Sequence, residues 1–136
     1  MIIRHYQAGD EDAQARIYNE AAGGLPGFKP ASAAEIARRY QASEPDPAAK
    51  FYAERDGALA GYAVFNTNGR ISYPWCLPGA QDLRAPLLAA VLAGLSARGV
   101  AEAWAAYRAD WSVVGDFLTE HRFVVKREMI NYIAPL

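Results

Sequence analysis

Two dipeptides, Asp56-Gly57 and Asn68-Gly69, constrain the fold of this 136-residue chain more than any other feature. They interrupt the stretch "KFYAERDGALAGYAVFNTNGRISYPW" (residues 50–75), which is otherwise rich in aromatic and β-branched residues. Such dipeptides favour the two-residue type I′ turn, whose twist matches that of the flanking strands. We therefore expect an antiparallel meander of three strands. Pro74 falls in the third strand, residues 70–76, and its missing N–H must face a gap, a bulge or an edge.

Helical patterns lie on both sides of the meander. Before it, Asp10 is a candidate N-cap for a first helix, and Ser32 and Glu35 have the spacing of a capping box at the start of a second. The expected elements are a strand at 2–6, helices at 9–24 and 32–42, strands at 50–55, 58–67 and 70–76, a helix at 83–99, a strand at 101–107, a helix at 110–123 and a strand at 124–136. This order, β-α-α-β-β-β-α-β-α-β, indicates a mixed fold of the α/β or α+β class, with residues 1–136 as a single domain.

The composition excludes several classes of function. A formal net charge of −1 argues against an electrostatic nucleic-acid binder. The single cysteine, Cys76, excludes an internal disulfide and a cysteine-based zinc site, and it suits a reducing cytoplasm. The start of the chain does not have the pattern of a signal peptide, and no apolar run is long enough to span a bilayer. We therefore expect a cytoplasmic protein that uses no metal and binds neither nucleic acid nor a membrane.

The order of elements, together with three local phrases, resembles the GNAT superfamily of N-acetyltransferases over nearly the whole chain. The phrases are "IRHYQAGDEDA" (residues 3–13), "ERDGALAGYAVF" (residues 54–65) and "VVGDFLTEHRF" (residues 113–123). The resemblance implies a mixed, mostly antiparallel sheet with helices on both faces, which splays open between the strands at 70–76 and 101–107. Acetyl-CoA or another acyl-CoA would enter that gap, and its acyl group would pass to a small-molecule or peptide amine.

The stretch "CLPGAQDLRAPLL" (residues 76–88) lies where the resemblance places the acyl-CoA. The backbone of Cys76 and Leu77 would pair with the pantetheine, and the loop that follows would hold the pyrophosphate. The loop residues concerned are Gly79, Ala80, Gln81, Asp82, Leu83 and Arg84.

This loop departs from the family's pattern, Gln/Arg-x-x-Gly-x-Gly/Ala, and it is shorter. Asp82 and Arg84 stand near the glycine positions, where side chains restrict the approach of a ligand to the backbone. Asp82 would also repel a diphosphate, whereas the guanidinium of Arg84 could replace lost donors. The alternative is an ordinary helix start, with Asp82 near the helix dipole and Arg84 in solvent.

The resemblance also implies a catalytic acid, usually a tyrosine, that protonates the departing thiolate. Its place falls on Phe117 or Leu118, neither of which can donate a proton. Tyr107, at the end of the strand at 101–107, is the substitute candidate. The alternative for Tyr107 is a packing role, with its hydroxyl at the surface.

Aromatic residues gather near the expected gap. They are Tyr73, Trp75, Trp104 and Trp111, together with Tyr107. These side chains either line a pocket for a small substrate or pack as ordinary core.

The last segment, "VVKREMINYIAPL" (residues 124–136), contains no turn residue, so we expect one long strand where the family has a hairpin. A long terminal strand would leave an open edge, which proteins normally cover. A homodimer through this strand, or a second domain, would cover it.

Two hypotheses follow for function. The first is an acyl-CoA-dependent N-acetyltransferase with an altered pyrophosphate loop. The second is a non-catalytic GNAT-like module that binds a small ligand or a protein, or that forms the degenerate half of a tandem protein. Binding of acetyl-CoA distinguishes the two.

Overall fold

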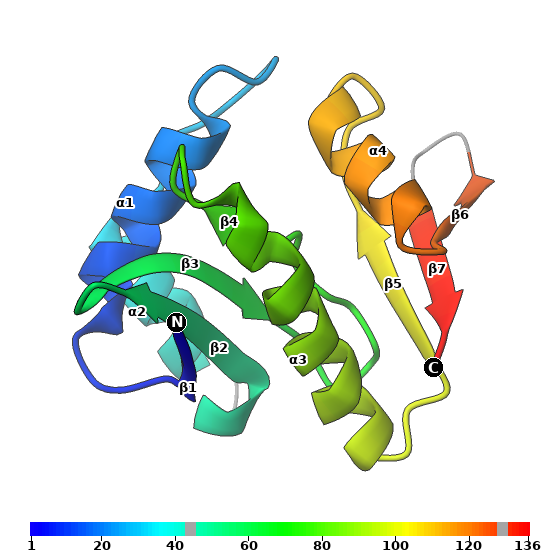
Figure 1. Ribbon diagram of the computed structural model, residues 1–136, viewed down its shortest axis with the longest axis horizontal. Coiled ribbons are helices and arrows are strands. Elements are labelled where there is room, and N and C mark those ends of the chain that lie inside the picture. The colour runs from blue at the N-terminus through cyan, green and yellow to red at the C-terminus, as the bar shows by residue number, and fades with distance from the viewer. Residues whose placement is uncertain (43–45, 128–130) are drawn as a thin grey trace.

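The computed structural model describes residues 1–42, 46–127 and 131–136 of the chain. Its strands form two antiparallel sheets, in the orders β1-β2-β3-β4 and β5-β7-β6 (Figure 1). The strands are β1 (Ile2–His5), β2 (Lys50–Arg55), β3 (Ala58–Val64), β4 (Trp75–Cys76), β5 (Glu102–Ala106), β6 (Val124–Arg127) and β7 (Asn131–Pro135). The helices are α1 (Asp10–Ala22), α2 (Ala33–Ala42), α3 (Arg84–Ala97) and α4 (Ser112–Glu120), with short 3-10 helices η1 (Pro47–Ala49) and η2 (Gln81–Leu83). The predicted fold class and element order are confirmed up to α4.

The two turns of the meander differ from each other. Asp56 and Gly57 have φ angles of 54° and 79°, which the predicted type I′ turn requires at both central positions. The prediction of a second type I′ turn is wrong, because Gly69 (φ 97°) has a positive φ angle and Asn68 does not. The N–H of Gly69 donates to the carbonyl of Asn66 at 3.0 Å, which makes a longer loop with a left-handed glycine at its end.

The third strand of the meander is interrupted. The N–H groups of Ser72 and Leu77 donate to carbonyls of Val64 and Ala60 on the β3 side, at 2.9 and 2.8 Å. In a regular strand, the backbone N–H groups of residues an odd number apart point to opposite sides. Ser72 and Leu77 are an odd number apart, yet both of their N–H groups point toward β3, so the backbone between them is irregular. Pro74 lies in this interval, which confirms the expectation of a break or bulge there, and regular pairing is confined to β4.

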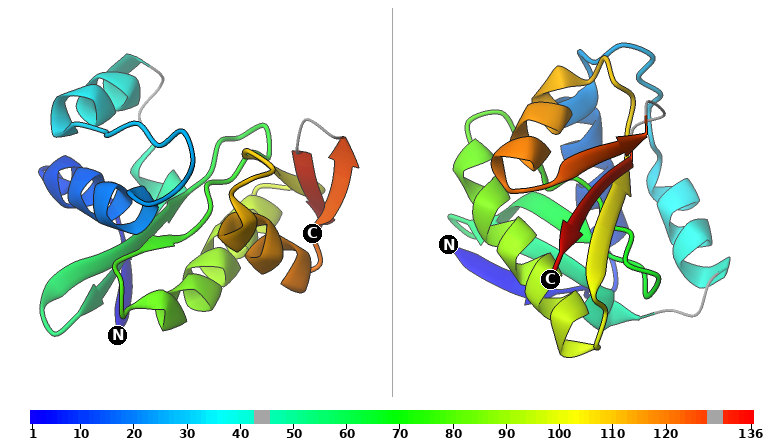
Figure 2. Two further views of the ribbon diagram at one scale, coloured as in Figure 1. Left: turned by 90° about the horizontal axis from the view of Figure 1, so that it is seen from above. Right: turned by 90° about the vertical axis from the view of Figure 1, so that its right-hand side faces the viewer.

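Helices cover both faces of the first sheet (Figure 2). Helix α1 packs against β3 and β4 and is itself covered by α2, whereas α3 packs against β2 and β3 on the opposite face. Ile17 on α1 and Leu87 and Val91 on α3 are fully buried in the resulting core. The hydroxyl of Tyr52 donates to Oε1 of Gln14 at 2.6 Å, so this buried polar pair is satisfied.

The two helix starts predicted from the sequence have different outcomes. Ser32 caps α2, since its hydroxyl accepts the N–H of Glu35 at 3.2 Å. Asp10 is not the N-cap of α1 but its first residue. Its buried carboxylate turns back to accept the N–H of Gln7 at 2.7 Å and two guanidinium hydrogen bonds from Arg4 at 2.9 and 3.0 Å. This contact ties β1 to the start of α1.

The expectation of one long terminal strand is wrong. Strands β6 and β7 pair as an antiparallel hairpin, and β7 lies between β5 and β6. Residues 128–130, which connect them, lie outside the described residues. Because β7 is paired on both sides, the last strand has no open edge, and the reason for expecting a dimer through it is removed.

The Arg4–Asp10 pair makes stability depend on pH. Burial raises the pKa of Asp10, but the hydrogen bonds from Arg4 and from the Gln7 N–H outweigh burial and lower it overall. Its contribution is therefore present above the unfolded pKa of about 3.9 and is lost as the pH falls through the lower, folded pKa. We expect Asp10→Asn to lower the free energy of unfolding at pH 7 by about 2 kcal/mol. The difference from the wild type should shrink below about pH 4.

Denaturant titrations across pH measure this effect. Asp12→Asn, on the exposed face of the same helical turn, is the matched control and should cost about 0.5 kcal/mol. Equal losses in the two variants, or a loss for Asp10→Asn that persists at low pH, would contradict the assignment.

Candidate functional site

The two sheets are joined at one end and separate toward the other. Arg70 and Trp104 form a parallel bridge, in which the Ile71 N–H donates to the Trp104 carbonyl at 2.8 Å and the Trp104 N–H to the Gly69 carbonyl at 2.9 Å. Among the described residues, β4 and β5 make no further ladder with each other. The splayed arrangement implied by the resemblance is therefore present, and we call the space between β4 and β5 the split.

Aromatic side chains fill the split. Trp75 lies at the centre, with ring centroids at 4.8 Å from Tyr73, 5.1 Å from Tyr18, 6.0 Å from Trp111 and 6.2 Å from Tyr107. All four contacts are edge-to-face, the geometry that aromatic pairs favour. Tyr73, Trp75 and Trp111 are buried. These predicted pocket residues are thus brought together as a packed cluster.

Trp104 lies apart from this cluster. It sits at the joined end of the sheets, where its indole N–H donates to the Asn68 carbonyl at 3.1 Å and the guanidinium of Arg70 lies 5.4 Å from its ring. The split opens away from this bridge. The backbone pairing of Trp104 with Arg70 therefore keeps the Trp104 side chain beside the loop that follows β3.

Tyr107 reaches across the split to Tyr73, two residues before β4. Its hydroxyl accepts the N–H of Tyr73 at 2.6 Å. The neighbouring Ser72 N–H points toward β3, so the Tyr73 N–H is a backbone donor that faces the split. Burial raises the pKa of Tyr107 to about 12, although the hydrogen bond from Tyr73 lowers it. The hydroxyl therefore lies inside the split and remains protonated at neutral pH.

The loop after β4 is a tight turn. The N–H of Ala80 donates to the carbonyl of Leu77 at 2.9 Å, with Pro78 and Gly79 (φ 86°) at the centre of the turn. Proline followed by a left-handed glycine is typical of a type II turn. The N–H groups of Leu83 and Arg84 bond to the Ala80 and Gln81 carbonyls, so η2 consumes donors that would otherwise face a ligand.

The charged side chains of this loop have protein partners. Both carboxylate oxygens of Asp82 accept from the guanidinium of Arg55. Arg84 turns inward, where it donates to the Tyr73 hydroxyl at 2.8 Å and lies 4.7 Å from the ring of Phe117. The alternative of an Arg84 in open solvent is therefore wrong. Sequence reasoning missed the Arg55–Asp82 pair, because nothing in the local pattern links β2 to this loop.

The remaining predicted residues lie at the end of β4. Cys76 is buried, and burial raises the pKa of its thiol to about 12, so the thiol is an unreactive packing group at neutral pH. Leu77 packs partly buried at the edge of the core. Phe117, one of the two residues at the position where the resemblance implies an acid, packs against Tyr73 with ring centroids 5.5 Å apart.

Two loops close one side of the split. The indole N–H of Trp111 donates to the carbonyl of Pro26 in the α1–α2 loop at 2.6 Å. A Cβ at Gly27, which has a φ of 68°, would lie 1.9 Å from a guanidinium nitrogen of Arg108. The positive φ favours glycine at this position, and the contact with Arg108 brings the α1–α2 loop onto the segment before α4.

Two clefts lie elsewhere on the molecule. One of about 1010 Å³ lies between α2, the start of β2 and the loop after β3, and one of about 470 Å³ lies along the exposed side of α3. Sequence reasoning missed the larger cleft, since its walls come from segments far apart in the chain. In the described residues no group of acidic, histidine or cysteine side chains is arranged to hold a metal, and no helix is long and apolar enough to cross a membrane.

No protein-family model matches the chain, and no curated protein matches its sequence. Solved structures do match its fold. A GCN5-related N-acetyltransferase from Rhodopseudomonas palustris aligns over 99% of this chain and 95% of its own, with a TM-score of 0.78 and 15% identity.

The ribosomal-protein-S18-alanine N-acetyltransferase of Escherichia coli aligns over 98% of this chain and 92% of its own, with a TM-score of 0.76 and 18% identity. A putative acetyltransferase from Salmonella typhimurium, solved with its cofactor acetyl-CoA, aligns over 100% and 92%, with a TM-score of 0.75 and 18% identity. At these identities the likeness shows the fold alone. Across its full length, the chain has the fold of the GNAT N-acetyltransferases.

Proposed function

We propose that this protein binds an acyl-CoA in the split and transfers the acyl group to an amine. The observation that carries the proposal is the N–H of Tyr73, which faces the split and has a side-chain hydroxyl as its acceptor. An extended ligand can pair with such a backbone donor in the way that a peptide adds to the edge of a sheet. The Salmonella typhimurium protein holds acetyl-CoA on the same fold.

The contact between Tyr107 and Tyr73 does not prevent such binding. A net hydrogen bond contributes about 1 kcal/mol, whereas a ligand of micromolar affinity supplies about 8 kcal/mol. Movement of the Tyr107 side chain would free the Tyr73 N–H and leave the Tyr107 hydroxyl within the split.

The loop residues fit a diphosphate in part. Arg55 and Arg84 place two guanidinium groups around the loop. Each guanidinium can donate two parallel hydrogen bonds to the oxygens of one phosphate group. Asp82 opposes this role, because its carboxylate occupies Arg55 and would repel a diphosphate. Binding of the pyrophosphate therefore requires the Arg55–Asp82 pair to open.

Tyr107 is the proposed catalytic acid. An acyl-CoA would supply a thioester carbonyl, whose carbon–sulfur bond breaks as the amine nitrogen bonds to carbon. The sulfur then needs a proton, and the Tyr107 hydroxyl, with its pKa raised by burial to about 12, carries one at neutral pH. The nitrogen loses its surplus proton to solvent water, and Tyr107 regains a proton from solvent, so the step balances. Before the ligand binds, the backbone N–H of Tyr73 holds this hydroxyl in the split, and pairing of the ligand with that N–H would release the hydroxyl to reach the sulfur.

A second candidate is a non-catalytic GNAT-like module, or the degenerate half of a tandem protein. The packed rings of the split and the Arg55–Asp82 pair favour it, because both occupy positions that an acyl-CoA would need. Its ligand would then bind outside the split.

Acetyl-CoA binding separates the two candidates. At a hundredfold excess over Kd, a ligand specific for the native state should stabilise it by about 2.7 kcal/mol, which is about 10 °C in Tm for a chain of this size. Differential scanning fluorimetry with acetyl-CoA measures the shift, and Arg84→Met should reduce it. No shift at millimolar acetyl-CoA would exclude the transferase and leave the non-catalytic module.

The loop predicts a variant that binds more tightly. Asp82→Asn removes the negative charge that faces the diphosphate and releases Arg55, so we expect the Kd for acetyl-CoA to fall several-fold in calorimetry. Asp12→Asn makes the same change of charge on α1 and should leave the Kd unchanged. An Asp82→Asn variant with unchanged or weaker affinity would place the pyrophosphate elsewhere.

Tyr107→Phe tests the acid. With an acceptor found by amine screening, kcat should fall about 100-fold, because general acids contribute 100-fold or more. The Kd for acetyl-CoA should not rise, since the variant loses a competitor for the Tyr73 N–H. Tyr18→Phe, which removes a hydroxyl from the same cluster, is the control and should retain kcat. A kcat loss shared by both variants would assign Tyr107 a packing role.

A further inference from the structure

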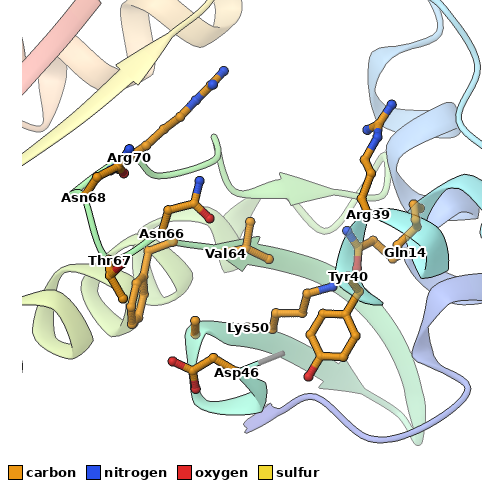
Figure 3. A pocket seen from close by; sticks show the side chains of 13 residues that line it. Gln14, Arg39, Tyr40, Asp46, Lys50, Val64, Asn66, Thr67, Asn68 and Arg70 are labelled. Atoms are coloured by element: carbon orange, nitrogen blue, oxygen red, sulfur yellow. The ribbon is translucent and has the colours of Figure 1, made fainter. Parts of the chain in front are cut away.

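The cleft of about 1010 Å³ beneath α2 has a lining that the proposed transfer reaction does not use (Figure 3). Its walls are α2, the segment around η1 and the start of β2, and the end of β3 with the loop that follows. Polar and basic side chains from these walls are Arg39, Lys50, Asn66, Thr67, Asn68 and Arg70. Figure 3 shows Arg39 and Arg70 on opposite sides of the cleft, with Lys50 and Asn66 between them.

Lys50 is the best positioned of these groups. Its ammonium nitrogen lies 4.3 Å from the ring centroid of Tyr40 and 5.4 Å from that of Tyr6. The rings of Tyr6 and Tyr40 pack on each other with centroids 4.6 Å apart, and the Tyr6 hydroxyl donates to Glu11. These contacts hold the two rings in place beside the ammonium. Cation–π contacts of this kind orient an ammonium group without neutralising its charge.

The basic side chains of the cleft differ in whether a carboxylate pairs with them, and Arg39 pairs with Glu35 at 3.7 Å. Arg4, Arg55, Arg98 and Arg108 each pair with a carboxylate within 4.0 Å. Lys50 and Arg70 have no such partner among the described residues. The two carboxylates whose charges act on Lys50 are engaged elsewhere, since Asp10 binds Arg4 and Glu11 accepts from Tyr6.

The acid that lines the cleft is also engaged. Asp46 pairs with Arg98 and accepts the N–H of Ala48 at 3.1 Å. Burial lowers the pKa of Lys50, against the opposing effect of Glu11 and Asp10, because the partly buried ammonium is less well solvated than in water. An anion in the cleft would offset that loss of solvation by pairing with the ammonium.

We propose that this cleft binds a small molecule that carries a carboxylate or phosphate group. Lys50 supplies the fixed charge, Asn66 supplies an amide donor, and Arg70, whose guanidinium lies over the Trp104 ring, adds positive charge on the opposite wall, within a volume that suits a small ligand. The proposal does not rest on acyl transfer, because the cleft and the split share no side chain.

The sequence offers a direct test, since Lys29, Lys50 and Lys126 are its only lysines. Protein labelled with ¹³C-lysine gives one Cε signal for each, assigned by single Lys→Arg variants. The probes are citrate and inorganic phosphate, titrated separately at constant ionic strength, with sodium chloride as the control. We expect the Lys50 signal to move and saturate while those of Lys29 and Lys126 stay in place. Saturation by citrate, by phosphate or by both supports the site and identifies the group that it prefers.

Variants provide the second readout. Lys50→Met keeps the aliphatic stem and removes the charge, so affinity for the effective probe should fall at least about tenfold in calorimetry. Arg70→Met on the opposite wall, which is exposed, should weaken binding with little effect on folding. Lys29→Met is the matched control and should bind as the wild type. Equal movement of all three lysine signals, a response matched by sodium chloride, or unchanged affinity in Arg70→Met and Lys50→Met would overturn the proposal.

Discussion

The packing of Trp75 in the split is the interaction on which the arrangement of the two sheets depends. The sheets are bonded to each other near Gly69 and Trp104 and diverge beyond that point. Protein interiors are close-packed, so a wedge between diverging sheets has to be filled by side chains. Trp75 fills it and touches rings from α1, from the segment just before β4 and from the segment that follows β5. Its burial therefore holds the sheets at a defined separation.

Polar groups at the split and in the cleft differ in the partners that they have within the protein. At the split, the Tyr73 N–H and the guanidinium of Arg55 have partners in Tyr107 and Asp82. The Tyr73–Tyr107 contact pairs a backbone donor inside the split, whereas the Arg55–Asp82 pair lies at the surface, and both contacts compete with any ligand. In the cleft beneath α2, the ammonium of Lys50 is held by aromatic rings and keeps its charge. Access to the split therefore requires rearrangement, whereas the cleft presents a fixed charge to a small molecule.

Local chemistry explains which predictions from the sequence were confirmed. The Asp56-Gly57 turn and the Ser32 cap depend on residues only a few positions apart, and both form as predicted. Asp10 departed from its expected capping role because Arg4, on a neighbouring strand, offered a stronger partner. The terminal hairpin was missed because its connection carries no turn residue, while β5 provides the edge on which β7 pairs.

The sequence by itself determined the order of the elements up to α4, the meander and the place of the loop between β4 and α3. These features arise from periodicity, turn residues and caps, which act over short stretches of chain. Only the tertiary structure decided that Arg84 turns inward to Tyr73, that Tyr107 spans the split and that Lys50 lies between two tyrosine rings. The partners of these side chains come from distant segments, and their proximity is set by how the sheets and helices pack, which no local pattern encodes.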